Sequence, residues 1–239
     1  DFEKVLKQIR DGSRMELSYK SVSFKDWSTY LIGERTDNEL IDEYIENTEK
    51  YENQLKLYDC NITYKNSIKR ELILTKDRTS QLLNLVNENN MISELDMVMT
   101  AVTMALNKIL PSDCLIADME WHGRNESDEI DVSRTIGWFT AISPIVIENL
   151  TENIESTMKK IKDGIKKAKE YSKNNTFVSW YCQNRINKKS VLKMNYLGNY
   201  SSVLDKELFG YADYETGVDI SEDNYMENPI EVNAIIVDS

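Results

Sequence analysis

The sequence contains few of the residues that build the common metal and phosphate sites. Among 239 residues there is one His, and the three Cys lie far apart at Cys60, Cys114 and Cys182. Since structural zinc sites need several closely spaced Cys and His ligands, this spacing predicts neither a metal site of that kind nor a disulfide framework. The eight Gly never form the GxGxxG or GxxxxGK pattern that cradles a phosphate. Such cysteine usage is typical of the reducing cytoplasm.

Positive charge is also scarce. Asp and Glu number 41 against 29 Lys and Arg, which gives a formal net charge of −12. This balance disfavours nucleic acid, whose phosphates are bound mainly by Lys and Arg. The most apolar window, residues 97–106, is far shorter than the roughly 20 residues that span a bilayer, and no signal-like stretch opens the chain. We therefore expect a cytoplasmic globular protein with no nucleic-acid or membrane partner.

Apolar periodicity predicts helices first and then an alternation of helices and strands. Helices are predicted over residues 1–10, 23–31, 38–57, 79–87 and 93–109, and from residue 149 to 168. Strands are predicted over residues 68–74, 114–122, 137–147, 191–196, 208–214 and 230–237. The pattern indicates an α/β fold.

Three helix starts carry capping signals. Ser23 with Asp26 and Ser93 with Asp96 have the spacing of a capping box, and Asn149 is followed by an acidic residue three positions later. The helix that follows Ser93 is apolar almost all round, so we expect it to be buried.

The stretch with the clearest chemical content is residues 118–124, DMEWHGR. If it ends a strand, the two-residue period places Asp118, Glu120 and His122 on one face. A strand that delivers a carboxylate and an imidazole at its C-terminal end is a common way for α/β folds to build a site. Gly123 would allow the turn, and Arg124 would neutralise or orient a carboxylate. The alternative is an ion-pair cluster that closes the strand end, with His122 merely hydrogen-bonded.

Four stretches together resemble the signature motifs of the epimerization domains of nonribosomal peptide synthetases, in the condensation-domain superfamily. Residues 120–124 (EWHGR) resemble the family's EGHGRE, and residues 134–144 (RTIGWFTAISP) resemble RTVGWFTxxYP. Residues 96–101 (DMVMTA) are similar to its DxLLxA helix, and residues 194–198 (MNYLG) to its FNYLG strand. Order and spacing agree, and the similarity reaches from the first helix to residues 233–238.

The resemblance implies an α+β sandwich, a chloramphenicol-acetyltransferase-like lobe whose mixed sheet has helices packed on it. In that family two such lobes enclose a tunnel. Residues 1–34 would be the tail of the N-terminal lobe, and residues 35–239 would form the C-terminal lobe.

The reaction implied by the resemblance converts an L-aminoacyl or peptidyl residue into its D form by removing and returning the Cα proton. The substrate would be a thioester on the 4′-phosphopantetheine arm of a peptidyl carrier protein, with no cofactor bound directly. A thioester α-proton is weakly acidic, so the site needs a positioned base, typically worth about 10²–10⁴-fold, and stabilisation of the enolate. The other partner would be the N-terminal lobe of the same synthetase.

The motif assigns Glu120 as the catalytic acid or base. Asn195 and Tyr196 match positions that line the tunnel and position substrate. His122, Arg124 and Arg134 match motif positions whose expected role is structural, and we expect the neighbouring Trp138 and Phe139 to be core residues.

Several family features are missing. With His122 as the only histidine, the tandem-histidine motif HHxxxDG cannot be present, although it supplies the opposing catalytic group. Trp121 and Asn125 replace a Gly and a Glu of the motif, and PxxGxGYG is not recognisable near residues 174–181. We therefore expect a part of a longer domain that is inactive alone. A condensation domain that forms peptide bonds, or a degenerate lobe that only docks a carrier protein, are the alternatives.

Six lysines lie between residues 159 and 169. They could steer an acidic carrier protein to this helix. We favour the alternative that they form a solvated helix surface.

Overall fold

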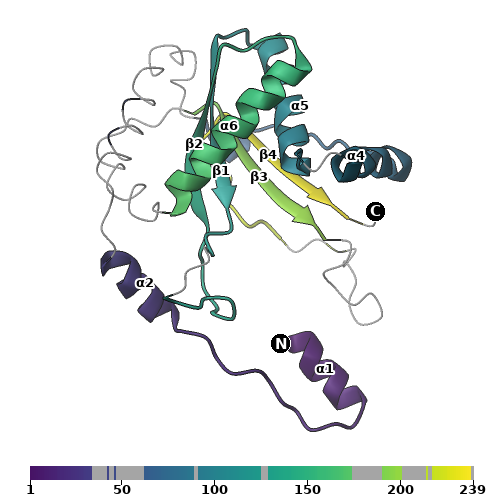
Figure 1. Cartoon of the computed structure of the whole chain (residues 1–239), viewed down its shortest axis with the longest axis vertical. Coiled ribbons are helices and arrows are strands. Elements are labelled where there is room, and N and C mark those ends of the chain that lie inside the picture. The colour runs from purple at the N-terminus through teal and green to yellow at the C-terminus, as the bar shows by residue number, and fades with distance from the viewer. Residues whose placement is uncertain are drawn as a thin grey trace.

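The computed structural model describes residues 1–33, 42, 46, 62–88, 91–124, 129–173, 190–200, 214 and 217–237. Its elements are shown in Figure 1. They run, in chain order, α1 (Phe2–Arg10), α2 (Phe24–Gly33), η2 (Tyr64–Asn66), α4 (Lys76–Glu88), α5 (Glu94–Ile109), β1 (Cys114–Trp121), β2 (Ala141–Glu148), α6 (Ile154–Lys173), β3 (Leu192–Asn199) and β4 (Ile230–Ile236). The predicted alternation of helices and strands in the second half of the chain is confirmed.

A four-stranded mixed sheet with the order β2-β1-β3-β4 forms the centre of the fold. β1 pairs antiparallel with β2 and parallel with β3, and β3 pairs parallel with β4. The two inner strands carry the stretches that the sequence singled out, DMEWHGR on β1 and MNYLG on β3. The sheet therefore brings these two stretches side by side.

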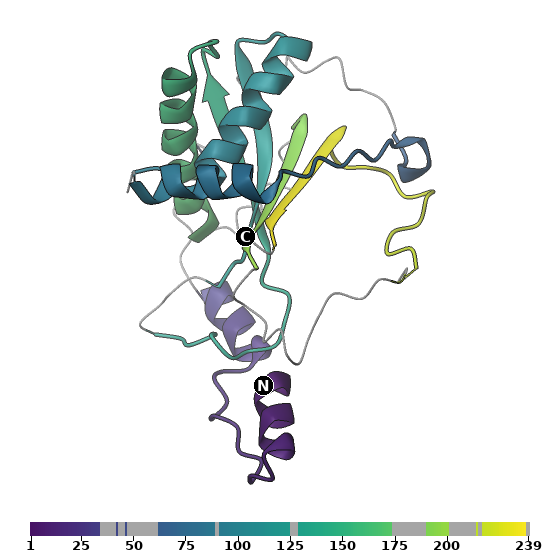
Figure 2. The ribbon, with the colours of Figure 1, turned by 90° about the vertical axis from the view of Figure 1, so that its right-hand side faces the viewer.

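Helices α5 and α6 cover one face of this sheet (Figure 2). Met119 of β1, Ile145 of β2 and Met194 of β3 point into this layer, where each is no more than 1% exposed. Gly164 allows α6 to approach closely, because a Cβ there would lie 2.7 Å from Ile145 Cγ1. On the opposite side of the sheet lie η2 and residues 217–229 (Figure 2). Alternate strand residues, among them Glu120, point to this second side.

A second, smaller core lies between α2 and the segment that precedes β2. Trp27 of α2 packs with Val132 and Phe139, and all three are buried. Phe139 is thus a core residue, as predicted. Trp138 is not, because its side chain is 80% exposed. Neighbouring residues of an extended segment point to opposite sides, so only one of the two aromatic residues can enter this core.

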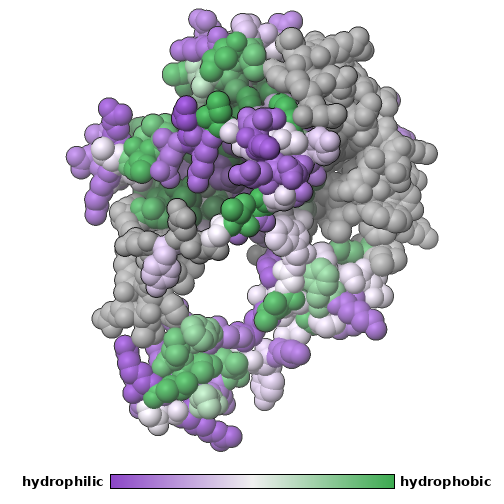
Figure 3. Space-filling model, turned by 180° about the vertical axis from the view of Figure 1, so that it is seen from behind, coloured by the Kyte–Doolittle hydropathy of each residue, from purple (hydrophilic) through white to green (hydrophobic). Residues whose placement is uncertain are grey.

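Helix α1 has no buried residues. Apolar side chains gather over it in Figure 3, and Phe2 and Ile9 are 69% and 57% exposed. The predicted boundary between residues 34 and 35 falls outside the described residues, so this division of the chain stays a prediction.

Two of the three predicted helix starts are correct. Ser93 and Asp96 form the predicted capping box of α5, since each accepts a hydrogen bond from the other's backbone N–H. Ser23 and Asp26 do the same for α2. The cap predicted at Asn149 is wrong. Asn149 has φ 52° in the turn after β2, and the Ser156 N–H instead donates to Asn153 Oδ1 at 2.8 Å.

The strand predicted over residues 68–74 is wrong. These residues form an irregular connection between η2 and α4 (Figure 2), in which Leu72 and Ile73 are 87% and 78% exposed. A β-former pattern makes a strand only where a partner strand and a covering layer exist. The strand predicted from residue 137 begins at Ala141. Those predicted at residues 114, 191 and 230 are confirmed within one residue of their starts.

Helix α5 is buried on one side only. Met99 is fully buried, but Ile109 at its end is 74% exposed. The prediction that this helix is buried is therefore correct for one face only, since α5 packs on the sheet and α6 along a single face. The helix predicted over residues 38–57 and the strand over 208–214 lie almost wholly outside the described residues.

No helix within the described ranges is both long and apolar enough to cross a membrane.

Candidate active site

Glu120 lies near the C-terminal end of β1, on the face away from α5 and α6. Its side chain is 18% exposed, and its Oε1 lies 2.8 Å from Nζ of Lys193 on β3, whose side chain is 25% exposed. The carboxylate is therefore partly withdrawn from water and held by a cation. The sequence predicted the position of Glu120 on this face, but it did not identify Lys193.

Asn195 lies beside Glu120. Met119 pairs with Met194 in the parallel register of β1 and β3, so Glu120 and Asn195 are the next residues along the two neighbouring strands. Paired residues of adjacent strands share a face, which puts the amide of Asn195 on the same side as the carboxylate. Two of the three residues assigned to catalysis or substrate positioning are thus brought together.

Tyr196 lies on the other side of the sheet. Its ring packs against the main core under the helices. Burial, with a further contribution from the negative charge of Glu94, raises the pKa of Tyr196 to about 12. The tunnel-lining role of Tyr196 stays a prediction, and its contacts here are with the core.

Lys193 is surrounded by acidic groups. Burial by itself would lower its pKa, but the hydrogen bond and charge of Glu120, together with the charges of Glu227 and Glu231, hold the pKa of Lys193 above its usual value. Glu231 also accepts a hydrogen bond of 3.0 Å from the Tyr64 hydroxyl. Burial, the hydrogen bond to Glu231 and the negative charges of Glu231 and Glu227 raise the pKa of Tyr64. A polar row therefore crosses this face from β1 to η2.

A buried polar cluster surrounds Asp118, which lies two residues before Glu120 on β1. The Asp118 carboxylate, 6% exposed, accepts hydrogen bonds from the Ser190 hydroxyl and from Asn228 Nδ2, the latter at 3.1 Å. Asn228 Nδ2 also contacts the Ser190 carbonyl at 3.2 Å. The cluster joins β1 to the segments that lead into β3 and β4. Sequence reasoning missed Ser190 and Asn228, because no local pattern links positions so far apart in the chain.

The turn after β1 is held by its own motif residues. The Arg124 backbone N–H donates to His122 Nδ1 at 3.0 Å, and Arg124 Nη1 donates to the Val132 carbonyl at 2.6 Å. The Arg124 guanidinium also lies 4.0 Å from the centre of the Phe139 ring. These contacts fix the turn against the segment before β2, and His122 is exposed.

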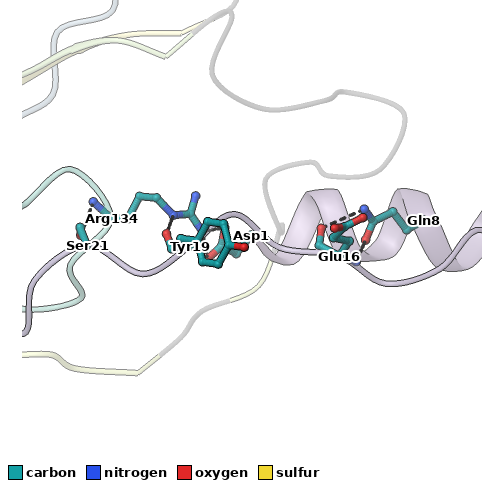
Figure 4. A network of polar contacts seen from close by, with 6 residues as sticks. All are labelled: Asp1, Gln8, Glu16, Tyr19, Ser21 and Arg134. Atoms are coloured by element: carbon teal, nitrogen blue, oxygen red, sulfur yellow. Dashed lines mark hydrogen bonds and ion pairs between the residues drawn. The ribbon is translucent and has the colours of Figure 1, made fainter.

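Arg134 joins this segment to the N-terminal part of the chain (Figure 4). Its Nη2 lies 2.7 Å from Asp1 Oδ1, its Nε donates to the Tyr19 carbonyl at 3.1 Å, and its backbone N–H donates to Ser21 Oγ at 3.1 Å. The described contacts of Arg134 are thus with residues 1–21 and do not include Glu120.

Trp121, which replaces the first Gly of the family motif, points to the helix-covered face. Its indole N–H donates to Ser143 Oγ at 2.6 Å, and that hydroxyl donates to the Ala168 carbonyl of α6. The indole therefore occupies the side of β1 opposite to Glu120. The region of the PxxGxGYG motif, residues 174–181, lies outside the described residues.

At least four of the six lysines on α6, Lys167 among them, make contacts within the chain. Lys160 and Lys162 donate to the backbone carbonyls of Asn149 and Met91, and the Lys169 ammonium lies 5.7 Å from the Trp121 ring. Much of this positive charge is thus engaged by neighbouring segments. Among the described residues, no group of three or more His, Cys, Asp or Glu could hold a metal ion.

Comparison with known proteins identifies the family. The model of the condensation domain matches residues 1–238. Bacitracin synthase 2 of Bacillus licheniformis is 26% identical over 246 residues, which cover 99% of this chain and 9% of that protein. Gramicidin S synthase 1 of Brevibacillus brevis is 24% identical over 237 residues, which cover 93% of this chain and 22% of that protein.

Two solved structures share the fold. The epimerization domain from the third module of tyrocidine synthetase B superposes with a TM-score of 0.78 at 22% identity, covering 99% of this chain and 56% of that one. The first condensation domain of the CDA synthetase superposes with a TM-score of 0.60 at 12% identity, covering 82% and 42%. The chain thus spans about half of either solved domain and a small part of each synthase. It has the predicted mixed-sheet lobe, and it belongs to the condensation domain family of nonribosomal peptide synthetases.

Proposed function

We propose that this chain is the C-terminal lobe, with the tail of the N-terminal lobe, of a nonribosomal peptide synthetase epimerization domain, in which Glu120 is one of the two groups that remove and return the Cα proton. The substrate is an aminoacyl or peptidyl thioester on the 4′-phosphopantetheine of a peptidyl carrier protein. The observation that carries the proposal is the placement of Glu120. Its carboxylate lies at the end of a buried strand, is only 18% exposed, and shares its face with Asn195.

The chemistry of α-proton exchange suits this arrangement. A carboxylate accepts the proton while the electron pair of the Cα–H bond moves into the enolate of the thioester. A partly desolvated setting strengthens the interactions that stabilise the developing charge, and an amide such as that of Asn195 can donate to an enolate oxygen. Return of the proton to the opposite face of Cα needs a second group. We assign that group to the tandem-histidine motif of an N-terminal lobe, since this chain has no histidine besides His122.

The partners follow from the same proposal. The carrier protein delivers the thioester, and the N-terminal lobe completes the tunnel and the acid–base pair. A cytoplasmic location, as expected for such synthetases, belongs to the proposal as well.

The test measures the exchange of the substrate α-proton with deuterium from the solvent on an aminoacyl-phosphopantetheine thioester. The chain is joined to the N-terminal lobe of the tyrocidine synthetase epimerization domain, which carries the fold that the chain matches. Exchange by the fusion is expected to be lost in Glu120→Gln and kept in Glu222→Gln, an exposed control. Exchange that survives Glu120→Gln would contradict the proposal. Exchange by the chain alone, abolished by Glu120→Gln, would contradict the need for the second lobe.

A condensation reaction is the second candidate. It is favoured by the ion pair with Lys193, which gives Glu120 a structural partner that needs no proton transfer. Amine attack on a thioester would then form a peptide bond, with no D-residue. Chiral analysis of the fusion's products separates the two reactions. Formation of D-residues at a normal rate would also exclude a degenerate lobe that only docks a carrier protein.

A further inference from the structure

Lys193 lies one residue before the stretch that resembles the FNYLG motif, so the motif assigns it no role. It nevertheless makes the described contact to the Glu120 carboxylate, with Nζ 2.8 Å from Oε1. Both residues come from inner strands of the sheet, and the two strands are tied in register at Asp118 and Lys193. The pairing of the two strands therefore fixes the backbone positions from which the ammonium and the carboxylate meet.

The groups around Lys193 keep it charged. Asp118 and Glu120 face it from β1, Glu231 lies beside it on β4, Glu227 lies in the segment before β4, and Tyr64 donates to Glu231 from η2. The acidic groups raise the pKa of Lys193 although burial opposes this. The side chain is thus a cation throughout the physiological pH range.

We propose that Lys193 is a positioning residue of the candidate active site, whose ammonium holds Oε1 of Glu120 and leaves Oε2 to exchange the Cα proton. This inference rests on the proposed function. In the exchange step the Cα–H bond breaks, its electron pair enters the enolate, and its proton forms the O–H bond at Oε2. The second group of the N-terminal lobe then protonates Cα from the opposite face, and the proton on Oε2 is released to solvent, so Lys193 gains and loses nothing.

The choice of lysine matters for this role. An ammonium is a compact charge that contacts one oxygen, whereas a guanidinium fork binds both oxygens of a carboxylate. If Lys193 only balanced the charge of Glu120, an arginine at this position would support proton exchange equally well. If Lys193 leaves Oε2 available, arginine would block the oxygen that carries the proton.

The first measurement uses the chain by itself. The Lys193 side chain is titrated by NMR with ¹³C-labelled lysine, and its signal is assigned by comparison with Lys193→Met. In the wild type the pKa of Lys193 is expected above its usual value, and Glu120→Gln is expected to lower it because the hydrogen bond and the charge of Glu120 are removed. A Lys193 titration that Glu120→Gln leaves unchanged would overturn the inference.

The second measurement is α-proton exchange by the fusion described above. Lys193→Met and Lys193→Arg are both expected to lower kcat, by about 10²-fold if the carboxylate is misplaced by an ångström, with little change in KM. Lys166→Met removes an exposed lysine of α6 and is expected to leave the rate unchanged.

Near-normal kcat in either Lys193 variant would overturn the inference about Lys193, while the Glu120→Gln result still tests the proposed function. A wild-type fusion without exchange would overturn the proposed function and the proton-exchange role together. Should Lys193→Met fail to fold, the Lys193→Arg rate and the Glu120→Gln titration still decide the matter.

Discussion

Gly123 and Phe139 are in direct backbone contact: a Cβ atom built on Gly123 would lie 1.5 Å from the Phe139 carbonyl oxygen. Gly123 also has φ 66°, a conformation that other residues rarely adopt. Residues 120–124 and residues 134–144, which both resemble family motifs, therefore meet at a position where only glycine fits. Arg124 adds to the contact through the Phe139 ring. The turn that follows Glu120 is thereby fixed against the segment before β2.

Gly123→Ala is expected to destabilise the protein strongly. Left-handed backbone costs a non-glycine residue about 1–2 kcal/mol, and relief of the overlap with Phe139 adds about 1–3 kcal/mol. The free energy of unfolding from urea denaturation should therefore fall by about 2–5 kcal/mol.

Gly198→Ala is the matched control. Gly198 has φ 85° in β3, but a Cβ there would meet nothing within 4 Å. It should show the backbone cost alone, about 1–2 kcal/mol. Equal losses in the two variants would contradict the close approach of Gly123 to Phe139.

Trp121→Phe is expected to cost about 1–2 kcal/mol, because the buried Ser143 hydroxyl loses the indole N–H. Since the ring lies on the helix-covered face, the Lys193 titration that reports on Glu120 should not change. Trp138→Phe alters a side chain that is 80% exposed and should leave stability within about 0.5 kcal/mol. A shifted Lys193 titration in Trp121→Phe would show that Trp121 acts on the site.

The sequence was sufficient to predict the local parts of this fold. The strand at β1, the face that carries Asp118 and Glu120, and the caps at Ser23 and Ser93 all follow from patterns of two to four residues. These patterns are fixed by the geometry of a strand or of a helix end.

The failures that concern burial and strand pairing share one physical cause. Residues 68–74 have the composition of a strand but no partner, and Trp138 and Phe139 are both aromatic although only one side of their segment is covered. The contact of Lys193 with Glu120 depends on the pairing of β3 with β1, which no local pattern of the sequence predicts. Which partner an element meets is set by tertiary packing, and one sequence does not contain that information in any local pattern.

Ser190→Ala is expected to lower the free energy of unfolding by about 1–3 kcal/mol, because the buried Asp118 carboxylate loses a donor. Asn228 remains as a donor, which limits the loss. Ser28→Ala removes an exposed hydroxyl that donates to the Lys25 carbonyl and should change stability by no more than about 0.5 kcal/mol. Similar effects of the two variants would mean that the Asp118 cluster does not join β1 to the neighbouring segments as described.

Tyr196 should make the stability of the protein depend on pH in the alkaline range. Its pKa is raised from 10.0 to about 12 by burial and by Glu94, so above pH 10 the unfolded chain loses this proton before the folded chain does. The stabilisation is then fully present below pH 10 and is lost as the pH rises from 10 to about 12. Urea denaturation across this range should show the difference between the wild type and Tyr196→Phe shrinking with pH, while Tyr19→Phe, at a position 97% exposed, controls for the loss of a phenol. A difference that stays constant from pH 9 upward would mean that the Tyr196 hydroxyl is not desolvated under α5, and that β3 presents this ring to solvent instead of to the core.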